Sequence, residues 1–444
     1  MIYSGLASPP KGATGIRALD TTSPRPSRSS ESLFVVCVFV LIEVSLWFGG
    51  TEGGADAMRG SLQAQVLWGI VYFAAAIGLF RCRKNLGELV RRSFPIIAII
   101  ALASVSIMWS TDPGITLKRA IGLWGTSAFG YYVVSRFRLK EFVDVLGVTC
   151  YAIVILSLVA ITLVPSVGVM HDSSAWRGIF AQKNILGEFM AISLLTFGTI
   201  IFSRSWPRSV AVVGVALSLA LLVGSQSASA LVICLLLLAG IGLTALYLRG
   251  ARGRIIMLVV VASALLTLLG LVASGLDTQA ILNALGRDDT LTGRTDLWPQ
   301  VVQAISNRPW LGYGYSAFWL PNGDFTYFIT SDWTPAHAHN GYLEACLDLG
   351  VVGATVAVLA ILSGVRRGVA LFDRHLAQCY AWPLLAVIYF LAVNLTESSI
   401  AKYNNFNWIV FIVAFLYASQ AARELPAQGR PRIPSAEPTM GAVA

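Results

Sequence analysis

The stretch "LVICLLLLAGIGLTALYL", residues 231–248, contains no charged side chain. The preceding run "VAVVGVALSLALLV", residues 210–223, is uncharged as well. Both are long enough to cross the roughly 30 Å hydrocarbon core of a bilayer as helices. Because backbone polar groups in lipid must be hydrogen-bonded within the protein, these runs predict helices that span a membrane.

Composition extends this prediction to the whole chain. Of its 444 residues, 56% are hydrophobic and 12% are charged, whereas soluble domains carry roughly 25% charged residues. The short alternating segments typical of a membrane β-barrel are not observed. We therefore expect an all-α integral membrane protein with about twelve transmembrane helices. The apolar segments lie at about 33–50, 62–80, 94–110, 115–134, 142–165, 184–203, 209–224, 228–248, 255–275, 342–363, 381–397 and 405–421.

The loops between these segments alternate in charge. Most lysines and arginines lie in the two tails and the even-numbered loops, so the positive-inside rule predicts that both termini are cytoplasmic. Basic loops such as "RCRKNLGELVRR", residues 81–92, then indicate topology, and the net charge of +9 does not indicate nucleic-acid binding. The expected organisation is a disordered cytoplasmic tail (1–32), helices one to nine (33–275), a large periplasmic loop with short helices (276–341), helices ten to twelve (342–421) and a second cytoplasmic tail (422–444).

Several kinds of chemistry are missing from the sequence. The six cysteines form no CxxC pair and no Cys/His metal spacing, so no metal site is predicted from them. Neither a Walker loop nor a Gly-x-Ser-x-Gly elbow is present. Charges inside the apolar segments are few, and such charges are functional candidates. They are Glu43, Lys118, Arg119, Glu188, Glu344 and Asp348.

Cationic side chains gather at three membrane entries on the predicted external face. Arg177 and Lys183 lie in "WRGIFAQKN", Arg294 in "GRTDLW", and His337 and His339 in "HAHN". Any one of these side chains alone is explained as an ordinary loop charge, or as a charge that extends from a helix end to the membrane surface. Together they suit an anionic ligand, because arginine offers a planar fork to phosphate oxygens and histidine can take a proton near neutral pH. This set favours transfer of a group from a phosphate leaving group to a hydroxyl.

The stretch "HNGYLEACLDLGVVG", residues 339–353, resembles the O-antigen ligase and polymerase superfamily, whose pattern is His, then Asn, Ser or Gln, nine residues, and Gly-x-x-Gly. "GRTDLWPQVVQAISNRPWLGYGYSAF" looks like a second block of that family. "WRGIFAQKNILGE" is similar to exopolysaccharide polymerases of the ExoQ and Wzy type. The similar blocks run from Trp176 to Gly353, and the first 170 residues match only in hydropathy.

This resemblance implies a metal-independent membrane glycosyltransferase in the bacterial inner membrane, with its active site facing the periplasm and no cofactor. The implied partners are an undecaprenyl-diphosphate-linked oligosaccharide and the lipid bilayer, with no nucleic acid. The implied reaction joins lipid-linked repeat units into exopolysaccharide or O-antigen. The alternative is an O-antigen ligase that transfers glycan to lipid A core. Whether a chain-length regulator protein also takes part stays open.

The resemblance also implies roles for individual residues. His339 is the expected catalytic base, Arg294 and Arg177 contact the diphosphate, and Lys183 supports them. His337 is either a supporting partner or a plain loop residue.

The helix that follows the histidines carries polar residues at regular spacing. Asn340, Glu344 and Asp348 follow one another at i, i+4 spacing and are expected on one helical face. Asn340 and Glu344 are expected to support the base, whereas for Asp348 the favoured interpretation is polarity at the helix start and an interhelical hydrogen bond. Gly350 and Gly353 are expected to let helices pack closely. His171 and His375 are assigned no role.

Two readings from other classes stay open. One is a multi-pass transporter or flippase, although no internal repeat is evident. The other is a metal-dependent membrane glycosyltransferase that uses Glu52 and Asp56 of the first external loop.

Overall fold

A computed structural model of the chain describes residues 29–44, 62–171, 173–257, 294–320, 335–375, 377 and 380–420. Regular structure in these ranges is helical, apart from a single β-bridge between Val169 and Trp176. The helices are α1 (Ser29–Val44), α3 (Leu62–Arg81), α4 (Arg83–Arg92), α5 (Phe94–Val105), η2 (Ser106–Met108), α6 (Pro113–Arg136), α7 (Leu139–Leu163), α8 (Pro165–Gly168), α9 (Lys183–Ser203), α10 (Arg208–Gly224), α11 (Ala228–Tyr247), α14 (Arg294–Asn307), α16 (Gly341–His375), α17 (Ala381–Val393) and α18 (Phe406–Gln420).

The predicted helical class is confirmed for the described residues. Five helices, α3, α7, α9, α11 and α16, are long and apolar enough to cross a membrane, and the α4–α5 pair makes a sixth if it counts as one broken span. Helices α10, α17 and α18 are apolar but shorter. The total of about twelve spans stays a prediction. Residues 1–28 of the predicted N-terminal tail, the whole C-terminal tail, most of the ninth segment, part of the large loop, and Glu52 and Asp56 lie outside the described residues. Residues 29–32, predicted as the end of the disordered tail, instead form the first turn of α1.

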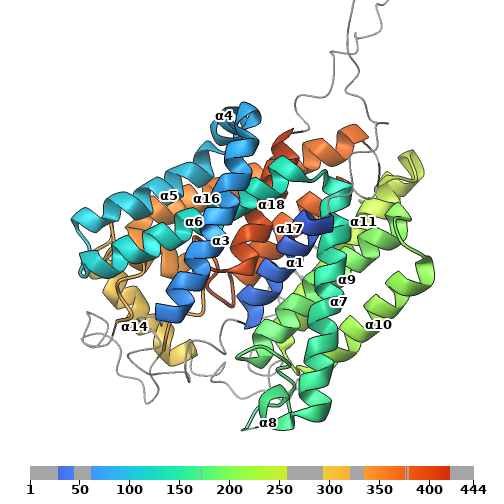
Figure 1. Cartoon of the computed structure of the whole chain (residues 1–444), viewed down its shortest axis with the longest axis horizontal. Coiled ribbons are helices and arrows are strands. Elements are labelled where there is room, and N and C mark those ends of the chain that lie inside the picture. The colour runs from blue at the N-terminus through green and yellow to red at the C-terminus, as the bar shows by residue number, and fades with distance from the viewer. Residues whose placement is uncertain are drawn as a thin grey trace, which may run out of the picture.

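Helices α5 and α16 pack side by side (Figure 1). At one end α14 lies beside the beginning of α16, and at the other α4 precedes α5. Beyond the far end of α5, the Trp109 indole donates to the carbonyl of Leu311 (2.9 Å), and Thr111 N–H donates to the carbonyl of Tyr313 (3.0 Å). The segment after α14 therefore packs where α5 ends, across the bundle from α4.

Helix α16 is broken at Gly350, where φ is 66° and ψ is −171°. The break exposes carbonyls, and the segment after α14 supplies their donors: Tyr313 N–H donates to Leu347 (2.8 Å) and Gly314 N–H donates to Asp348 (3.1 Å). A Cβ atom at Gly350 would lie 2.1 Å from the Trp310 carbonyl oxygen. Gly350 therefore ends one helical piece and starts another, and its lack of a side chain also lets the Trp310 backbone approach closely.

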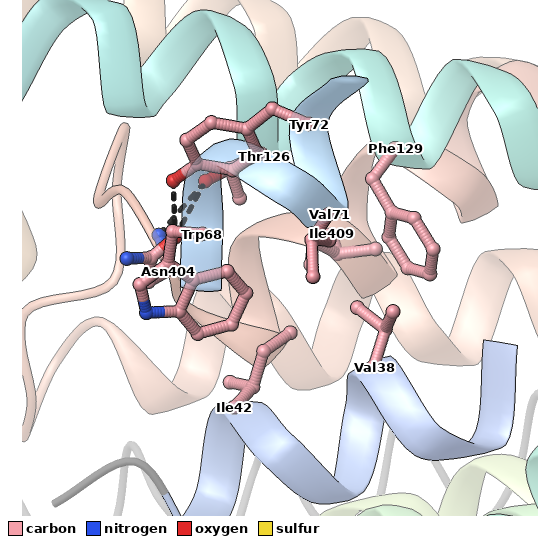
Figure 2. A pocket seen from close by; sticks show the side chains of 9 residues that line it. All are labelled: Val38, Ile42, Trp68, Val71, Tyr72, Thr126, Phe129, Asn404 and Ile409. Carbon is pink, nitrogen blue, oxygen red and sulfur yellow. Dashed lines mark hydrogen bonds between the residues drawn. The ribbon is translucent and has the colours of Figure 1, made fainter. Parts of the chain in front are cut away.

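Residues 394–405 connect α17 to α18 and are anchored by side chains. Asn404 N–H donates to Thr126 Oγ1 (2.8 Å), and the Asn404 side-chain oxygen accepts from Tyr72 Oη. These groups form the polar corner of a small, mostly apolar pocket between α1, α3, α6 and α18 (Figure 2). Tyr315 Oη donates to the Ala401 carbonyl (2.6 Å). Burial, with Asp348 nearby, raises the pKa of Tyr315 well above its usual value, so this hydroxyl remains a donor.

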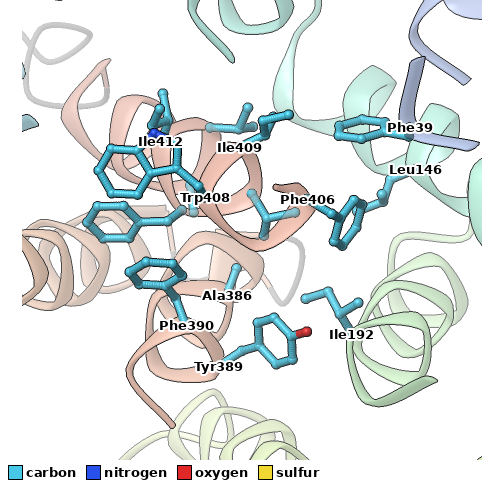
Figure 3. Packing of buried hydrophobic residues seen from close by; sticks show 14 of the residues in the cluster. Phe39, Leu146, Ile192, Ala386, Tyr389, Phe390, Phe406, Trp408, Ile409 and Ile412 are labelled. Carbon is cyan, nitrogen blue, oxygen red and sulfur yellow. The ribbon is translucent and has the colours of Figure 1, made fainter. Parts of the chain in front are cut away.

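The core surrounds α17 and α18, which are buried on almost every side. Phe390 stacks on Phe411 with ring centroids 4.4 Å apart, and Trp408 lies beside them (Figure 3). Phe406 contacts Phe39 of α1 and Phe189 of α9. A helix that is apolar all round belongs inside a bundle. The core therefore fixes the loop between α17 and α18 from both ends.

Candidate active site at the beginning of helix α16

The loop that carries the two histidines is held at Ala338, the residue between them. Glu344 Oε2 accepts the backbone N–H of Ala338 (2.7 Å), and Trp298 Nε1 donates to the Ala338 carbonyl (3.0 Å). The other oxygen of Glu344 accepts from Trp319 Nε1 (2.9 Å). The Glu344 carboxylate thus holds the histidine loop by binding N–H groups that would otherwise be buried without partners.

The beginning of α16 is fixed by two asparagines. Asn340 Oδ1 accepts the N–H groups of Tyr342 (3.0 Å) and Leu343 (3.2 Å), which is an N-cap arrangement. Gly341 N–H donates to the Asn394 carbonyl (2.8 Å), and a Cβ atom at Gly341 would lie 2.0 Å from Asn394 Oδ1. The supporting role predicted for Asn340 is therefore structural: it sets where the helix starts. Close contact with Asn394 ties that start to the end of α17.

His339 forms a pair with Glu397, which lies in the loop after α17. Its Nδ1 is 3.2 Å from Glu397 Oε2, and both side chains are largely buried, with 12% and 9% exposed. His339 has a φ of 48°, in the left-handed region that non-glycine residues rarely adopt. An ionised carboxylate accepts the Nδ1 proton, so the lone pair then lies on Nε2. This is the arrangement of a histidine base oriented by an acid.

His337 lies against the same carboxylate. Its Nε2 is 3.8 Å from Glu397 Oε2, and its ring centroid is 4.0 Å from that of His339. The backbone N–H of His339 donates to His337 Nδ1 (3.2 Å). In the neutral ring the proton then lies on Nε2, facing Glu397. His337 therefore lies in one cluster with His339 and Glu397.

The same three side chains could in principle hold a cation. The donor atoms of His337, His339 and Glu397 lie within 4.8 Å of one another. A metal needs a lone pair from each histidine. His337 Nδ1, however, already accepts a backbone N–H, which leaves the proton on the nitrogen nearest the carboxylate. A metal bound at His337 Nε2 would therefore have to displace this proton.

Arg177 and Lys183 lie on and beside the loop before α9. The Arg177 guanidinium donates to the backbone carbonyls of Val167 (2.8 Å), Ser166 (3.3 Å) and Ala181 (3.4 Å). Arg177 therefore shapes its own loop. Lys183 is the first residue of α9. In the described part of the chain, neither cation is joined to the histidines by a hydrogen bond or ion pair.

Helix α9 is nevertheless connected to the Glu397 loop by a polar chain. Tyr389 Oη lies 3.2 Å from the Glu188 carbonyl of α9 and 2.9 Å from Asn407 Oδ1. Asn407 Nδ2 in turn donates to Ser399 Oγ (3.2 Å), two residues after Glu397. The helix that starts at Lys183 and the loop of Glu397 are thus held in one framework.

Arg294 is the first residue of α14, and its side chain lies outside the described part of the structure. Trp298, one turn later, contacts the histidine loop at Ala338. Positions four apart share a helix face. The backbone of Arg294 is therefore one turn from a residue that touches the candidate site.

Three charged residues near the site were not predicted as part of it. Glu397 carried no signal beyond its place at the end of an apolar segment. Lys402 and Arg119 lie within electrostatic reach of Asp348, and Lys402 also of Glu344. Arg119 donates to Ser316 Oγ (3.1 Å) in the segment after α14. Arg119 stood out in the sequence as an intramembrane charge, but its partner could not be inferred from spacing.

Comparisons with known proteins cover much of this region. Residues 213–358 match the O-antigen ligase family, a span that includes His339 and Arg294 but not Arg177 or Glu397. The chain is also 25% identical over 286 residues to the exopolysaccharide production protein ExoQ of Rhizobium meliloti (strain 1021). That match covers 60% of this chain and 63% of the relative, so it spans less than two thirds of the relative's length. These two findings confirm the resemblance predicted from the sequence, which is to the superfamily of O-antigen ligases and ExoQ-type proteins.

Proposed function

We propose that the protein polymerises undecaprenyl-diphosphate-linked oligosaccharide repeat units into exopolysaccharide or O-antigen at the periplasmic face of the inner membrane. The similarity to an exopolysaccharide production protein favours polymerisation over ligation to lipid A core. The observation that carries the proposal is the His339–Glu397 pair, with 3.2 Å between Nδ1 and Oε2.

In the proposed reaction His339 Nε2 removes the proton of an acceptor sugar hydroxyl. The hydroxyl oxygen then forms the new bond to the anomeric carbon of the donor. The bond between that carbon and the diphosphate oxygen breaks, and undecaprenyl diphosphate leaves with the electron pair. Glu397 holds the imidazole and stabilises the imidazolium that forms, as the acid does in a catalytic triad. General base catalysis of this kind contributes about 10²–10⁴-fold to a rate.

The leaving diphosphate needs cations. Arg177, Arg294 and Lys183 are proposed for this role, with Arg177 able to act while it shapes its loop, because guanidinium carries five N–H groups and its carbonyl contacts use three. Lys402 is a further candidate, since it is exposed and lies within electrostatic reach of Glu344. No cofactor or metal enters this scheme.

Short helices suit a site near lipid headgroups. At 1.5 Å per residue, α17 and α18 span only about 20 Å, less than the roughly 30 Å hydrocarbon core. Irregular backbone at membrane depth is tolerated where protein or a polar cavity surrounds it. Residues 394–405 meet this condition through Asn394 and Asn404, whose side chains bind backbone N–H groups or side-chain hydroxyls around them. A diphosphate on a lipid would reach such a recessed site from the bilayer.

The decisive experiment is incubation of purified protein with a defined undecaprenyl-diphosphate oligosaccharide, followed by sizing of the products. A ladder of lengthened, lipid-linked glycan is expected. Transfer only when lipid A core is added would favour the ligase. Movement of the donor across vesicles without any lengthening would favour a flippase. The same incubation with EDTA tests metal independence. Loss of activity with EDTA would indicate that His337, His339 and Glu397 bind a metal.

A further inference from the structure

Helix α4 is nearly perpendicular to α5, the helix that follows it. Leu86–Arg92 and Phe94–Met108 meet at an 85° bend. The second piece is uniformly apolar, whereas α4 has one apolar edge and a strongly basic remainder. If α5 crosses the bilayer, a right-angle bend sets α4 along the membrane plane. Amphipathic basic helices in that orientation lie at the headgroup boundary.

Two arginines converge beside α4 on the end of α18. Arg92 Nη1 donates to the Ser419 carbonyl (2.6 Å). Arg367 Nη1, from the second half of α16, donates to Ser419 Oγ (2.6 Å) and to the Arg92 carbonyl (2.6 Å). Cations at a helix C-terminus satisfy its last carbonyls and oppose its dipole. These contacts bring α4, α16 and α18 together at one point.

The place where α4, α16 and α18 meet carries more positive charge than the neighbouring carboxylate neutralises. Arg91 and Arg366 are exposed beside Arg92 and Arg367, and Arg367 lies within electrostatic reach of both Arg366 and Arg92. In the described ranges, Glu88 is the one carboxylate that ion-pairs with this group, at 2.9 Å from Arg91 and 2.6 Å from Arg92. Four arginines against one carboxylate leave a surplus of three positive charges. Packed like charges are unfavourable unless an anion joins them.

Exposed aromatic side chains stand just before and just after α4. Phe94 is 70% exposed and Phe80 is 66% exposed, and the Arg83 guanidinium lies 4.6 Å from the Phe80 ring centroid. Exposed aromatic rings beside exposed arginines match the boundary between acyl chains and headgroups. A soluble anion would bind the arginines but would make no contact with acyl chains or with the aromatic rings.

We infer that Arg91, Arg92, Arg366 and Arg367 form a binding site for the phosphate headgroup of an anionic phospholipid. This arginine site lies across the bundle from His339, at the other end of α5 and α16. The charge distribution of the loops predicts that this face is cytoplasmic. The site is separate from the proposed transferase chemistry and does not depend on it. Bound lipid would fix α4 at the membrane surface.

The test uses full-length purified protein and native mass spectrometry. The probes are phosphatidylglycerol and phosphatidylcholine with the same acyl chains. Phosphatidylglycerol should be retained preferentially. The double variant Arg91→Gln/Arg366→Gln removes two exposed cations and spares the two that hold Ser419, so it should fold normally. It should weaken phosphatidylglycerol retention by about tenfold or more and leave phosphatidylcholine retention unchanged.

The matched control is Arg208→Gln/Arg252→Gln, which removes two exposed arginines from other loops predicted to lie on the same face. It should retain phosphatidylglycerol as the wild type does. Equal loss in both double variants would mean a diffuse basic surface and would overturn the proposal. Equal retention of the two lipids by the wild type would overturn it as well. Displacement of phosphatidylglycerol by millimolar inorganic phosphate would point to a soluble anion instead.

Discussion

The two ends of α16 show opposite ways of placing charged groups. At its beginning, His339 and Glu397 are largely buried and lie 3.2 Å apart, and Glu344 accepts hydrogen bonds of 2.7 and 2.9 Å from Ala338 and Trp319. Toward its far end, Arg366 and Arg367 join Arg91 and Arg92 in a cluster that is partly exposed and redundant. At the histidine end the position of each individual side chain matters most. At the arginine end the total positive charge matters more than the position of any one arginine.

This contrast explains why single substitutions should differ so much in effect. A buried donor or acceptor that loses its partner costs its full desolvation energy. An exposed arginine that loses a surface ion pair changes little. We therefore expect large effects around His339 and graded ones around Arg91.

The largest effect is expected for His339→Ala. Loss of the base should lower the rate of glycan lengthening by about 10²–10⁴-fold, with the protein still present in the membrane. The measurement is the in vitro product ladder from a defined lipid-linked donor. His171→Ala is the control, because His171 lies in the loop between α8 and α9 and has no assigned role. Wild-type activity in the His339 variant would remove its assignment as base.

Glu397→Gln should come next. The amide keeps the size of the side chain but loses the charge that stabilises the imidazolium, so kcat should fall by about 10–100-fold with little change in KM. Thr396→Val, at the neighbouring position, should keep both constants. If KM rose and kcat were unchanged, Glu397 would be a binding residue and the oriented-base scheme would fail.

The sequence predicted most of the helices, because unbroken apolar runs leave little choice of structure in lipid. Apart from the segment at 255–275, each predicted apolar segment coincides with a helix. The break at Gly350 was missed for a physical reason. Gly-x-x-Gly fits both close packing and a left-handed kink, and the sequence does not show that Gly350 adopts a φ of 66°.

The candidate site could be predicted from the sequence only in part, and its residues stay a prediction. His339 was singled out by its motif, since two histidines before an apolar helix are unusual in a chain with four. Glu397 follows it by more than fifty residues and lies in another loop, so no local spacing connects the pair. Lys402 also lies far from Glu344 in the sequence, and only the fold of residues 394–405 brings the two charges within electrostatic reach. Arg177 was predicted as a ligand group, but its carbonyl contacts could not be read from "WRGIFAQKN".

Gly350→Ala tests how rigid the histidine end is. The new Cβ would lie 2.1 Å from the Trp310 carbonyl oxygen, and alanine is strained at a φ of 66°, so the free energy of unfolding should fall by about 1–3 kcal/mol. Thermal unfolding in detergent measures this. Gly242→Ala is the matched control, because Gly242 lies within α11 with nothing within 4 Å of a Cβ atom, and it should be neutral or slightly stabilising. An unchanged Tm in the Gly350 variant would mean that the kink is not required.

The smallest effect is expected at the arginine end. Arg91 is 76% exposed at its side chain and shares Glu88 with Arg92, so Arg91→Gln should change the Tm by less than about 1 °C. Arg92→Gln should lower the Tm more, because it also leaves the Ser419 carbonyl at the end of α18 without its donor. Thermal unfolding of the two variants side by side is the measurement. A larger loss for Arg91 than for Arg92 would mean that charge at this end is placed as strictly as at His339, and the contrast between the two ends of α16 would then disappear.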